Sequence, residues 1–229
     1  MMAVARQMVS GHPAPQSTAA TGSAAISRAR MLIYVIGFLV AGLCFWHVTS
    51  TEPSASLSMI RLTEWYGFIA AACLFLALLV SPVCAAIPAL PGLGLLQGAR
   101  RAIGVCACAF AALHTGIGFL GLLGGWNGLS LLGPARLADV LLSLIALIIL
   151  CALTLTSSNR AQALMGVHWH RLHRLIYLAG GLTLLHMVAV GSHFLKWKLP
   201  AFTVAGLVLV LLILEWLRFS RNRADHHER

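Results

Sequence analysis

Six long stretches without a charged residue run through this sequence, and they limit what the chain can fold into more than any other feature. The stretches are residues 31–51, 65–99, 102–135, 140–159, 175–195 and 199–214. Hydrophobic residues make up 59% of the chain and charged residues 10%, whereas a soluble domain carries roughly 25% charged residues. Because a water-facing fold cannot bury so much apolar surface, the sequence predicts an integral membrane protein.

Each stretch is long enough for one membrane-spanning helix, which needs about 20 apolar residues. In the two longest stretches the surplus residues are turn signals rich in Gly and Pro, at 87–94 and 124–134. The predicted fold is therefore an all-α bundle of six transmembrane helices. Their expected positions are about 31–50, 64–87, 102–124, 137–156, 173–193 and 200–218.

The two ends of the chain differ from the apolar middle. Residues 1–30 are rich in Ala, Ser, Thr and Pro and poor in large apolar side chains. We therefore expect a disordered cytoplasmic tail there, a six-helix domain at 31–220, and a second short tail at 221–229. The first residues also lack the apolar run of a cleaved signal peptide.

Lys and Arg are distributed unevenly among the predicted connections, and this distribution predicts the orientation of the bundle. Twelve of the sixteen lie in the first tail, the second-to-third turn, the fourth-to-fifth loop and the C-terminal end, and four lie on the opposite side. Since cytoplasmic loops carry the excess of positive residues, both termini are expected in the cytoplasm. The same placement accounts for the net charge of +10 without nucleic-acid binding.

Two histidines lie well inside predicted spans, His114 in the third and His186 in the fifth. They follow Arg101 and Arg174 by 13 and 12 residues, which places them roughly 20 Å and 18 Å along helices that run in the same direction. Polar residues inside a bilayer are costly and often functional. Two imidazoles at one depth on facing helices suit the axial ligands of a low-spin haem. The alternative is that each histidine only bonds to a neighbouring helix.

His173 and His193 are further candidates. His173 begins the fifth span and lies about 140° from His186 around a straight helix, so the two share a face only if Gly180-Gly181 permits a kink. A structural role at the interface is the alternative for His173. His193 lies on the same face as His186, near the outer surface, where a haem edge or a quinone would be in reach.

The sequence gives little support for a zinc site, a covalently bound haem or an NAD(P)H site. The six cysteines form no Cys-x-x-Cys motif, which argues against zinc ribbons and covalent haem, and they are interpreted as small apolar residues. The chain also lacks a Gly-rich nucleotide motif, so NAD(P)H has no evident site.

Two segments resemble the ferric-reductase-like transmembrane superfamily. One is RRAIGVCACAFAALH at 100–114, and the other is ALTLTSSNR at 152–160, followed by HRLHRLIY at 170–177 and then His186. Within that superfamily the chain is most similar to the MsrQ (YedZ) family, the haem-binding membrane subunits of periplasmic methionine sulfoxide reductase systems. The resemblance covers about residues 31–220.

This resemblance implies a b-type haem in the bacterial inner membrane, with His114, His173 and His186 as ligands. It implies electrons from a cytosolic flavin reductase and delivery to a periplasmic molybdenum-cofactor enzyme. An interaction with FMN and with quinone is also implied, although the resemblance places neither on particular residues.

The sequence departs from related NADPH oxidases at one position. Those proteins have a second histidine 14 residues before the position of His114, where this chain has Arg100. An arginine cannot ligate iron but can pair with a haem propionate, so Arg100 and its neighbour Arg101 are candidate cofactor-binding residues. One haem between His114 and His186 is therefore expected, and a second near His173 would need another partner.

Three functions are compatible with these residues. The first is a membrane cytochrome that passes electrons from a cytosolic flavin reductase or quinol to a periplasmic oxidoreductase. The second is a stand-alone metal or quinone reductase that uses the same haem. The third is a membrane scaffold or transporter in which the histidines are structural, although the sequence lacks the inverted repeats of many transporters.

Overall fold

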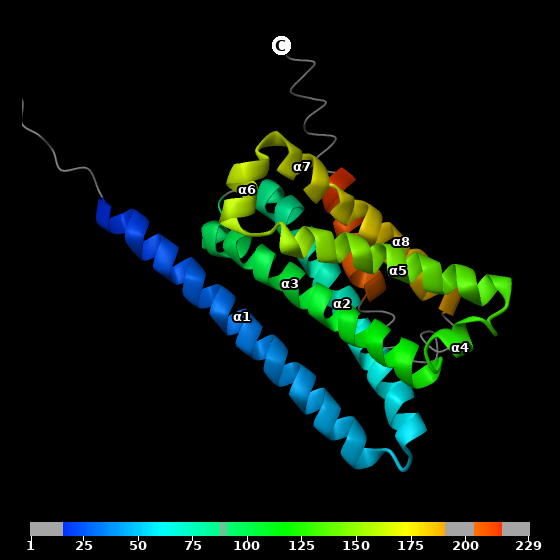
Figure 1. The fold of residues 1–229 in the computed structure, drawn as a ribbon. Coiled ribbons are helices and arrows are strands. Elements are labelled where there is room, and N and C mark those ends of the chain that lie inside the picture. The colour runs from blue at the N-terminus through cyan, green and yellow to red at the C-terminus, as the bar shows by residue number, and fades with distance from the viewer. Residues whose placement is uncertain (1–15, 88, 90, 191–203, 217–229) are drawn as a thin grey trace, which may run out of the picture.

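The computed structural model describes residues 16–87, 89, 91–190 and 204–216, and within these ranges every regular element is a helix (Figure 1). In chain order they are α1 (Gln16–Thr51), α2 (Ala55–Ala86), α3 (Leu93–Ile117), the π-helix η1 (Gly118–Leu122), α4 (Trp126–Leu129), α5 (Pro134–Leu155), α6 (Asn159–Met165), α7 (Val167–His173), α8 (Leu175–Val190) and an apolar helix at Val204–Trp216.

Five helical segments are long and apolar enough to cross a membrane. They are Gly22–Thr51, Ala55–Ala86, Leu93–Leu122, Pro134–Leu155 and Val167–Val190. The prediction of an all-α, multi-pass membrane protein is therefore confirmed. For the predicted sixth span at 200–218, the described part is the shorter helix Val204–Trp216, so the structure supports five of the six spans.

The centre of the bundle is α2. Its side chains Leu74, Phe75 and Leu78 are each at most 2% exposed. The α3 helix packs along α2, α5 packs on α8, and α1 lies along one side of the bundle against α3 (Figure 1). The outward surfaces of these helices are apolar, as a bilayer requires.

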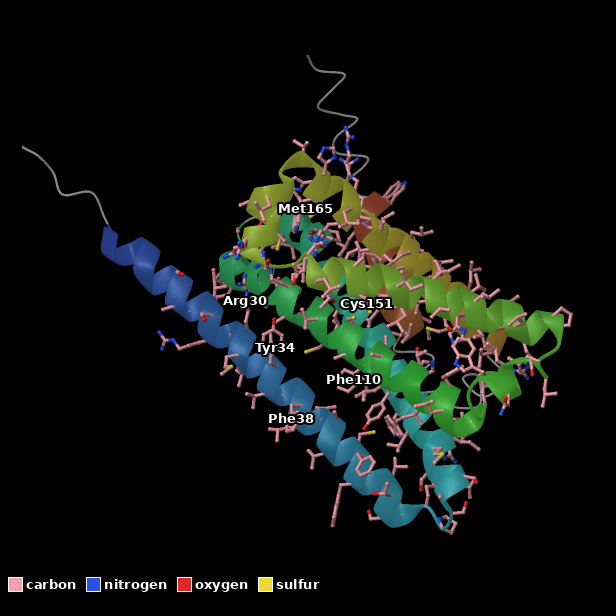
Figure 2. All side chains as sticks on the ribbon, in the orientation of Figure 1. Arg30, Tyr34, Phe38, Phe110, Cys151 and Met165 are labelled. Atoms are coloured by element: carbon pink, nitrogen blue, oxygen red, sulfur yellow. The ribbon has the colours of Figure 1, made fainter. Side chains whose placement is uncertain are left out.

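The first helix begins at Gln16, so residues 16–30, for which the sequence led us to expect a disordered tail, are drawn as helix in the structure. This segment is rich in alanine, which has the highest helix propensity. Its end is also fixed to α3, because the Arg30 Nε donates a hydrogen bond to the Gly98 carbonyl at 2.9 Å (Figure 2). The methyl-bearing side chain of Ile26 packs directly on Gly98. Residues 1–15 and 217–229 lie outside the described part of the chain.

The second helix also begins earlier than predicted, at Ala55 rather than near residue 64. The cause is the N-cap Ser54, whose hydroxyl accepts a hydrogen bond from the Leu57 N–H at 3.3 Å. The two predicted turns are found where glycine allows a left-handed backbone. Gly92 has φ +83°, and Gly124 and Gly125 have φ +67° and +72°.

The predicted fifth span consists of two helices, α7 and α8, which meet at Arg174. There the Arg174 N–H donates to the carbonyls of both His170 and Arg171, at 3.2 Å and 3.3 Å, which tightens the turn. The α8 helix continues unbroken through Gly180-Gly181. The boundary between the two helices therefore lies directly after His173 and not at the glycine pair.

Candidate functional site

The rings of His114 and His186 lie beside each other in the bundle. His114 belongs to the last turn of α3 and His186 to α8, and their ring centroids are 6.1 Å apart with planes at 77°. The two histidines that the sequence analysis placed at one depth are thus brought together by the fold.

Each of the two rings is held by a backbone carbonyl of a neighbouring helix. The Nδ1 atom of His114 lies 2.7 Å from the Thr63 carbonyl oxygen on α2. The Nδ1 atom of His186 lies 3.1 Å from the Asp139 carbonyl oxygen on α5. A carbonyl only accepts hydrogen bonds, so in both neutral rings Nδ1 carries the proton and Nε2 keeps its lone pair. This is the protonation state that a metal-ligating imidazole needs, with its second nitrogen oriented by a backbone partner.

A cavity of about 400 Å³, here called the histidine cavity, includes both rings in its wall. Its other walls come from α2, α5 and the adjoining parts of α3 and α8, and they are mainly apolar, with both large and small side chains. Representative lining residues are Gly67, Ala71, Ala111, Ala146 and Met187. The volume is within the range of cofactor sites, roughly 300–1,000 Å³.

The spacing of the two rings suits two ligands on opposite sides of one metal ion. A first-row metal binds an imidazole nitrogen at about 2 Å, which puts the centres of two opposed rings roughly 6 Å apart. Across residues 16–190 and 204–216, apart from the undescribed positions, no three metal-ligating side chains gather. Two opposed imidazoles are one of the ligand arrangements by which proteins hold haem iron.

A second cavity, of about 880 Å³, lies on the other side of Leu74 and Leu150, which line both spaces. We call it the basic cavity because its wall carries Arg30, Arg100, Arg101, His170, His173 and Arg174. His173 is thus separated from His114 and His186. The three candidate histidines therefore line two different cavities.

Arg100 and Arg101 make hydrogen bonds that connect helices. Arg100 Nε donates to the Ala77 carbonyl at 3.0 Å, and its Nη1 donates to the Ser81 hydroxyl at 2.8 Å, both on α2. Arg101 Nη1 donates to the Asn159 side-chain oxygen at the start of α6, at 2.6 Å. Each guanidinium has five N–H donors, so these contacts leave others for an anionic group in the basic cavity.

His173 is held by two residues that the sequence analysis did not single out. The indole of Trp169 stacks on the imidazole of His173, and the His173 Nε2 lies 3.3 Å from the Thr156 hydroxyl. Trp169 Nε1 also donates to the Thr156 carbonyl at 2.9 Å. The spacing of four residues between Trp169 and His173 on a helix was a usable signal. The candidate residue His193 lies outside the described residues.

Glu64, which the sequence indicated only as an acidic residue near the start of a helix, also lines the histidine cavity. It pairs with Arg61, whose Nη1 lies 3.2 Å from the Glu64 Oε2, and Arg61 Nε lies 3.3 Å from the Glu52 carboxylate. An ion pair thus borders the end of the cavity that is formed by the first turns of α2.

These observations define a class: a multi-pass α-helical membrane protein with two histidines that face a cofactor-sized apolar cavity. No family model matches the chain, and no solved structure matches it.

Curated relatives do match over most of their length. The chain is 31% identical over 202 residues to the "Protein-methionine-sulfoxide reductase heme-binding subunit MsrQ" of Salmonella arizonae, covering 85% of this chain and 94% of the relative. The protein of the same name from Salmonella enteritidis is 31% identical, and the match covers 84% of this chain and 93% of that relative. The one from an Enterobacter species is 30% identical, and the match covers 85% of this chain and 92% of that relative. The chain therefore belongs to the MsrQ family.

Proposed function

We propose that this protein is a b-type haem cytochrome of the bacterial inner membrane, which passes electrons from the cytoplasmic to the periplasmic side. The observation that carries the proposal is the pair His114 and His186, 6.1 Å apart in one apolar cavity. The names of the relatives support it, since they describe haem-binding subunits of a methionine sulfoxide reductase.

In this proposal His114 and His186 are the residues that would hold the haem iron, through their Nε2 atoms. When bound, the haem supplies a centre that accepts and releases one electron at a time. The protein fixes the two rings in advance, through the Thr63 and Asp139 carbonyls. The small apolar residues of α2, α3 and α5 give the macrocycle space and keep water away from it.

The basic cavity supports a second cofactor position on the electron-donor side. Its arginines suit the propionates of a second haem, with His173 as a ligand, or the phosphate of FMN. Leu74 and Leu150 are the only described residues that line both cavities, so a cofactor in each would be separated by little more than these two side chains. His193 and a quinone belong to the opposite, outer end in this scheme.

The partners follow from the same scheme. We propose a cytosolic flavin reductase or membrane quinol as donor, and a periplasmic molybdenum-cofactor reductase of the methionine sulfoxide type as acceptor. A stand-alone metal or quinone reductase would use the same cavities without a protein acceptor. A scaffold or transporter would not need two histidines that line one cavity and have their Nδ1 atoms bonded.

The test is a visible spectrum of the purified protein, before and after reduction with dithionite. We expect a Soret band that shifts on reduction and a sharp α band, the pattern of a low-spin b-type haem. A protein purified with haem supplied during expression, yet without these bands, would overturn the proposal. Oxidation of the reduced protein by a purified periplasmic acceptor, and not by ferric citrate or a quinone, would then separate the cytochrome from a stand-alone reductase.

A further inference from the structure

The ring of His114 lies against the backbone of α2 at a glycine. A Cβ atom built on Gly67 would be 2.6 Å from the His114 Nδ1 and 2.9 Å from its Cε1. Both distances are shorter than real Cβ contacts, so any other residue at position 67 would displace the ring or push α2 away from α3. The ring therefore occupies space that a side chain would otherwise fill.

The same glycine gives His114 access to its hydrogen-bond acceptor. In an α-helix each Cα–Cβ bond points toward the N-terminus, so the side chain of a residue covers the turn before it. Residue 67 is four positions after Thr63, whose carbonyl accepts the Gly67 N–H in the regular helical pattern. A side chain at 67 would cover this carbonyl, whereas glycine leaves it open to the His114 Nδ1 at 2.7 Å.

The backbone of α2 has little freedom to move aside at this point. Tyr66, the preceding residue, is 3% exposed, and its hydroxyl donates to the Ala41 carbonyl of α1 at 3.0 Å. Ala71, one turn later, is 2% exposed. A larger residue at position 67 would therefore move the His114 ring more readily than the helix.

We propose that Gly67 is a positioning residue for His114: the gap it leaves in α2 lets His114 bond to the Thr63 carbonyl, which fixes the tautomer with Nε2 facing the cavity. This inference rests on the proposed function in that the positioned nitrogen is the proposed haem ligand. Gly180 and Gly121, by contrast, face the apolar side chains of Leu78 and Met59, while Gly37 faces the thiol of Cys106. A purely structural glycine at 67 would permit helix packing and would not affect the tautomer of His114.

The experiment compares Gly67→Ala with Gly42→Ala, a control on α1 where an added Cβ would meet nothing within 4 Å. Both changes raise helix propensity to a similar degree. For Gly67→Ala we expect roughly 10- to 100-fold weaker haem retention, the usual effect of losing an outer-shell partner of a ligand. Haem that remains should show altered low-spin EPR g values and a more positive midpoint potential, because the ligand loses a bond that raises its basicity. Wild-type g values and potential in folded Gly67→Ala would overturn the inference.

A second measurement does not depend on haem or on the folding of Gly67→Ala. In haem-free wild type labelled with ¹⁵N-histidine, the signal that disappears in His114→Ala should have the chemical shifts of a hydrogen-bonded Nδ1–H tautomer. An Nε2–H tautomer at His114 would overturn the inference even if the protein binds haem. If the wild type binds no haem but shows the Nδ1–H tautomer, the proposed function fails while the bond from His114 to the Thr63 carbonyl stands. A different His114 tautomer in haem-free Gly67→Ala would then support the positioning role of Gly67, and an unchanged tautomer would overturn it.

Discussion

The indole of Trp169 and the imidazole of His173 are stacked, with ring centroids 3.9 Å apart and planes 26° apart. This contact, together with the Thr156 hydroxyl 3.3 Å from the His173 Nε2, keeps His173 at the wall of the basic cavity. His173 is therefore structurally independent of the pair His114 and His186, from which Leu74 and Leu150 separate it.

From this separation we predict that His173→Ala keeps the low-spin spectrum of the haem between His114 and His186. Any haem or flavin bound in the basic cavity should be lost in the same variant, because the variant lacks the imidazole ring that would contact this cofactor. The measurement is the haem and flavin content per protein, with EPR of the oxidised state. Loss of the low-spin signal in His173→Ala would contradict the assignment of His173 to a separate site.

We predict that His114→Ala and His186→Ala each abolish the low-spin spectrum while the protein still inserts into the membrane. Each change removes one axial imidazole, so the iron becomes five-coordinate and high-spin, or the haem is lost. His47→Ala is the matched control, because His47 is exposed on α1, away from both cavities. If both site variants keep the wild-type spectrum and haem content, the ligand pair is misassigned.

The positions of these histidines could be predicted from the sequence, but the way they are held could not. Charge-free stretches and the spacing from Arg101 and Arg174 fix the depth of a residue in a straight helix, because the rise per residue is constant. The acceptors of His114 and His186 are backbone carbonyls, and every residue has one. Which carbonyl faces a ring depends on the rotation of each helix about its axis, and this follows from packing between helices.

The ends of the helices were also only partly predictable from the sequence. Composition alone made the Ala- and Ser-rich residues 16–30 look disordered, yet the hydrogen bond from Arg30 to Gly98 and the contact of Ile26 tie this segment to α3. Both contacts join residues distant in sequence, which a local pattern does not reveal. Ser54, by contrast, is a local capping signal that would have placed the start of α2 correctly.

We predict that Gly180→Leu destabilises the bundle far more than Gly181→Leu. A Cβ on Gly180 would lie 3.1 Å from the Leu78 Cδ1 of α2, whereas one on Gly181 would meet nothing within 4 Å. Overpacking of this kind costs typically about 1–3 kcal/mol. Thermal unfolding in detergent should therefore show a clearly lower Tm for the Gly180 variant only. Equal Tm values would mean that α8 does not pack on α2 through Gly180.

The sulfur atoms of Cys108 on α3 and Cys151 on α5 are 3.7 Å apart, and Figure 2 shows Cys151 on the part of α5 near α3. Since a disulfide needs only a modest further approach of the two sulfurs, a membrane-permeant diazene oxidant should link them by taking two electrons and two protons. Mass spectrometry of the digested protein should find the Cys108–Cys151 pair. Cys84, which has no cysteine contact of this kind in the described residues, should stay unlinked. As a control, the same oxidant is added to denatured protein, in which the linked peptide should be detectable. If the peptide is found in that control but not in the folded protein, the packing of α3 on α5 is contradicted.

The last prediction concerns the electron donor. Arg171 and Arg174 are both exposed, on α7 and directly after it, and Arg174 also lines the basic cavity. If an acidic flavin reductase binds this face, its attraction should weaken with salt, because the Debye length falls from about 10 Å at 0.1 M to about 3 Å at 1 M. We expect reduction of the haem by the flavin reductase to slow several-fold in Arg171→Glu/Arg174→Glu at low salt, and to slow in wild type as salt rises. Arg136→Glu, which changes an exposed arginine at the opposite end of the bundle, is the control and should leave the rate unchanged. The measurement is stopped-flow absorbance of the protein in nanodiscs, and a rate that depends on neither salt nor these arginines would contradict docking of the flavin reductase on this face by charge.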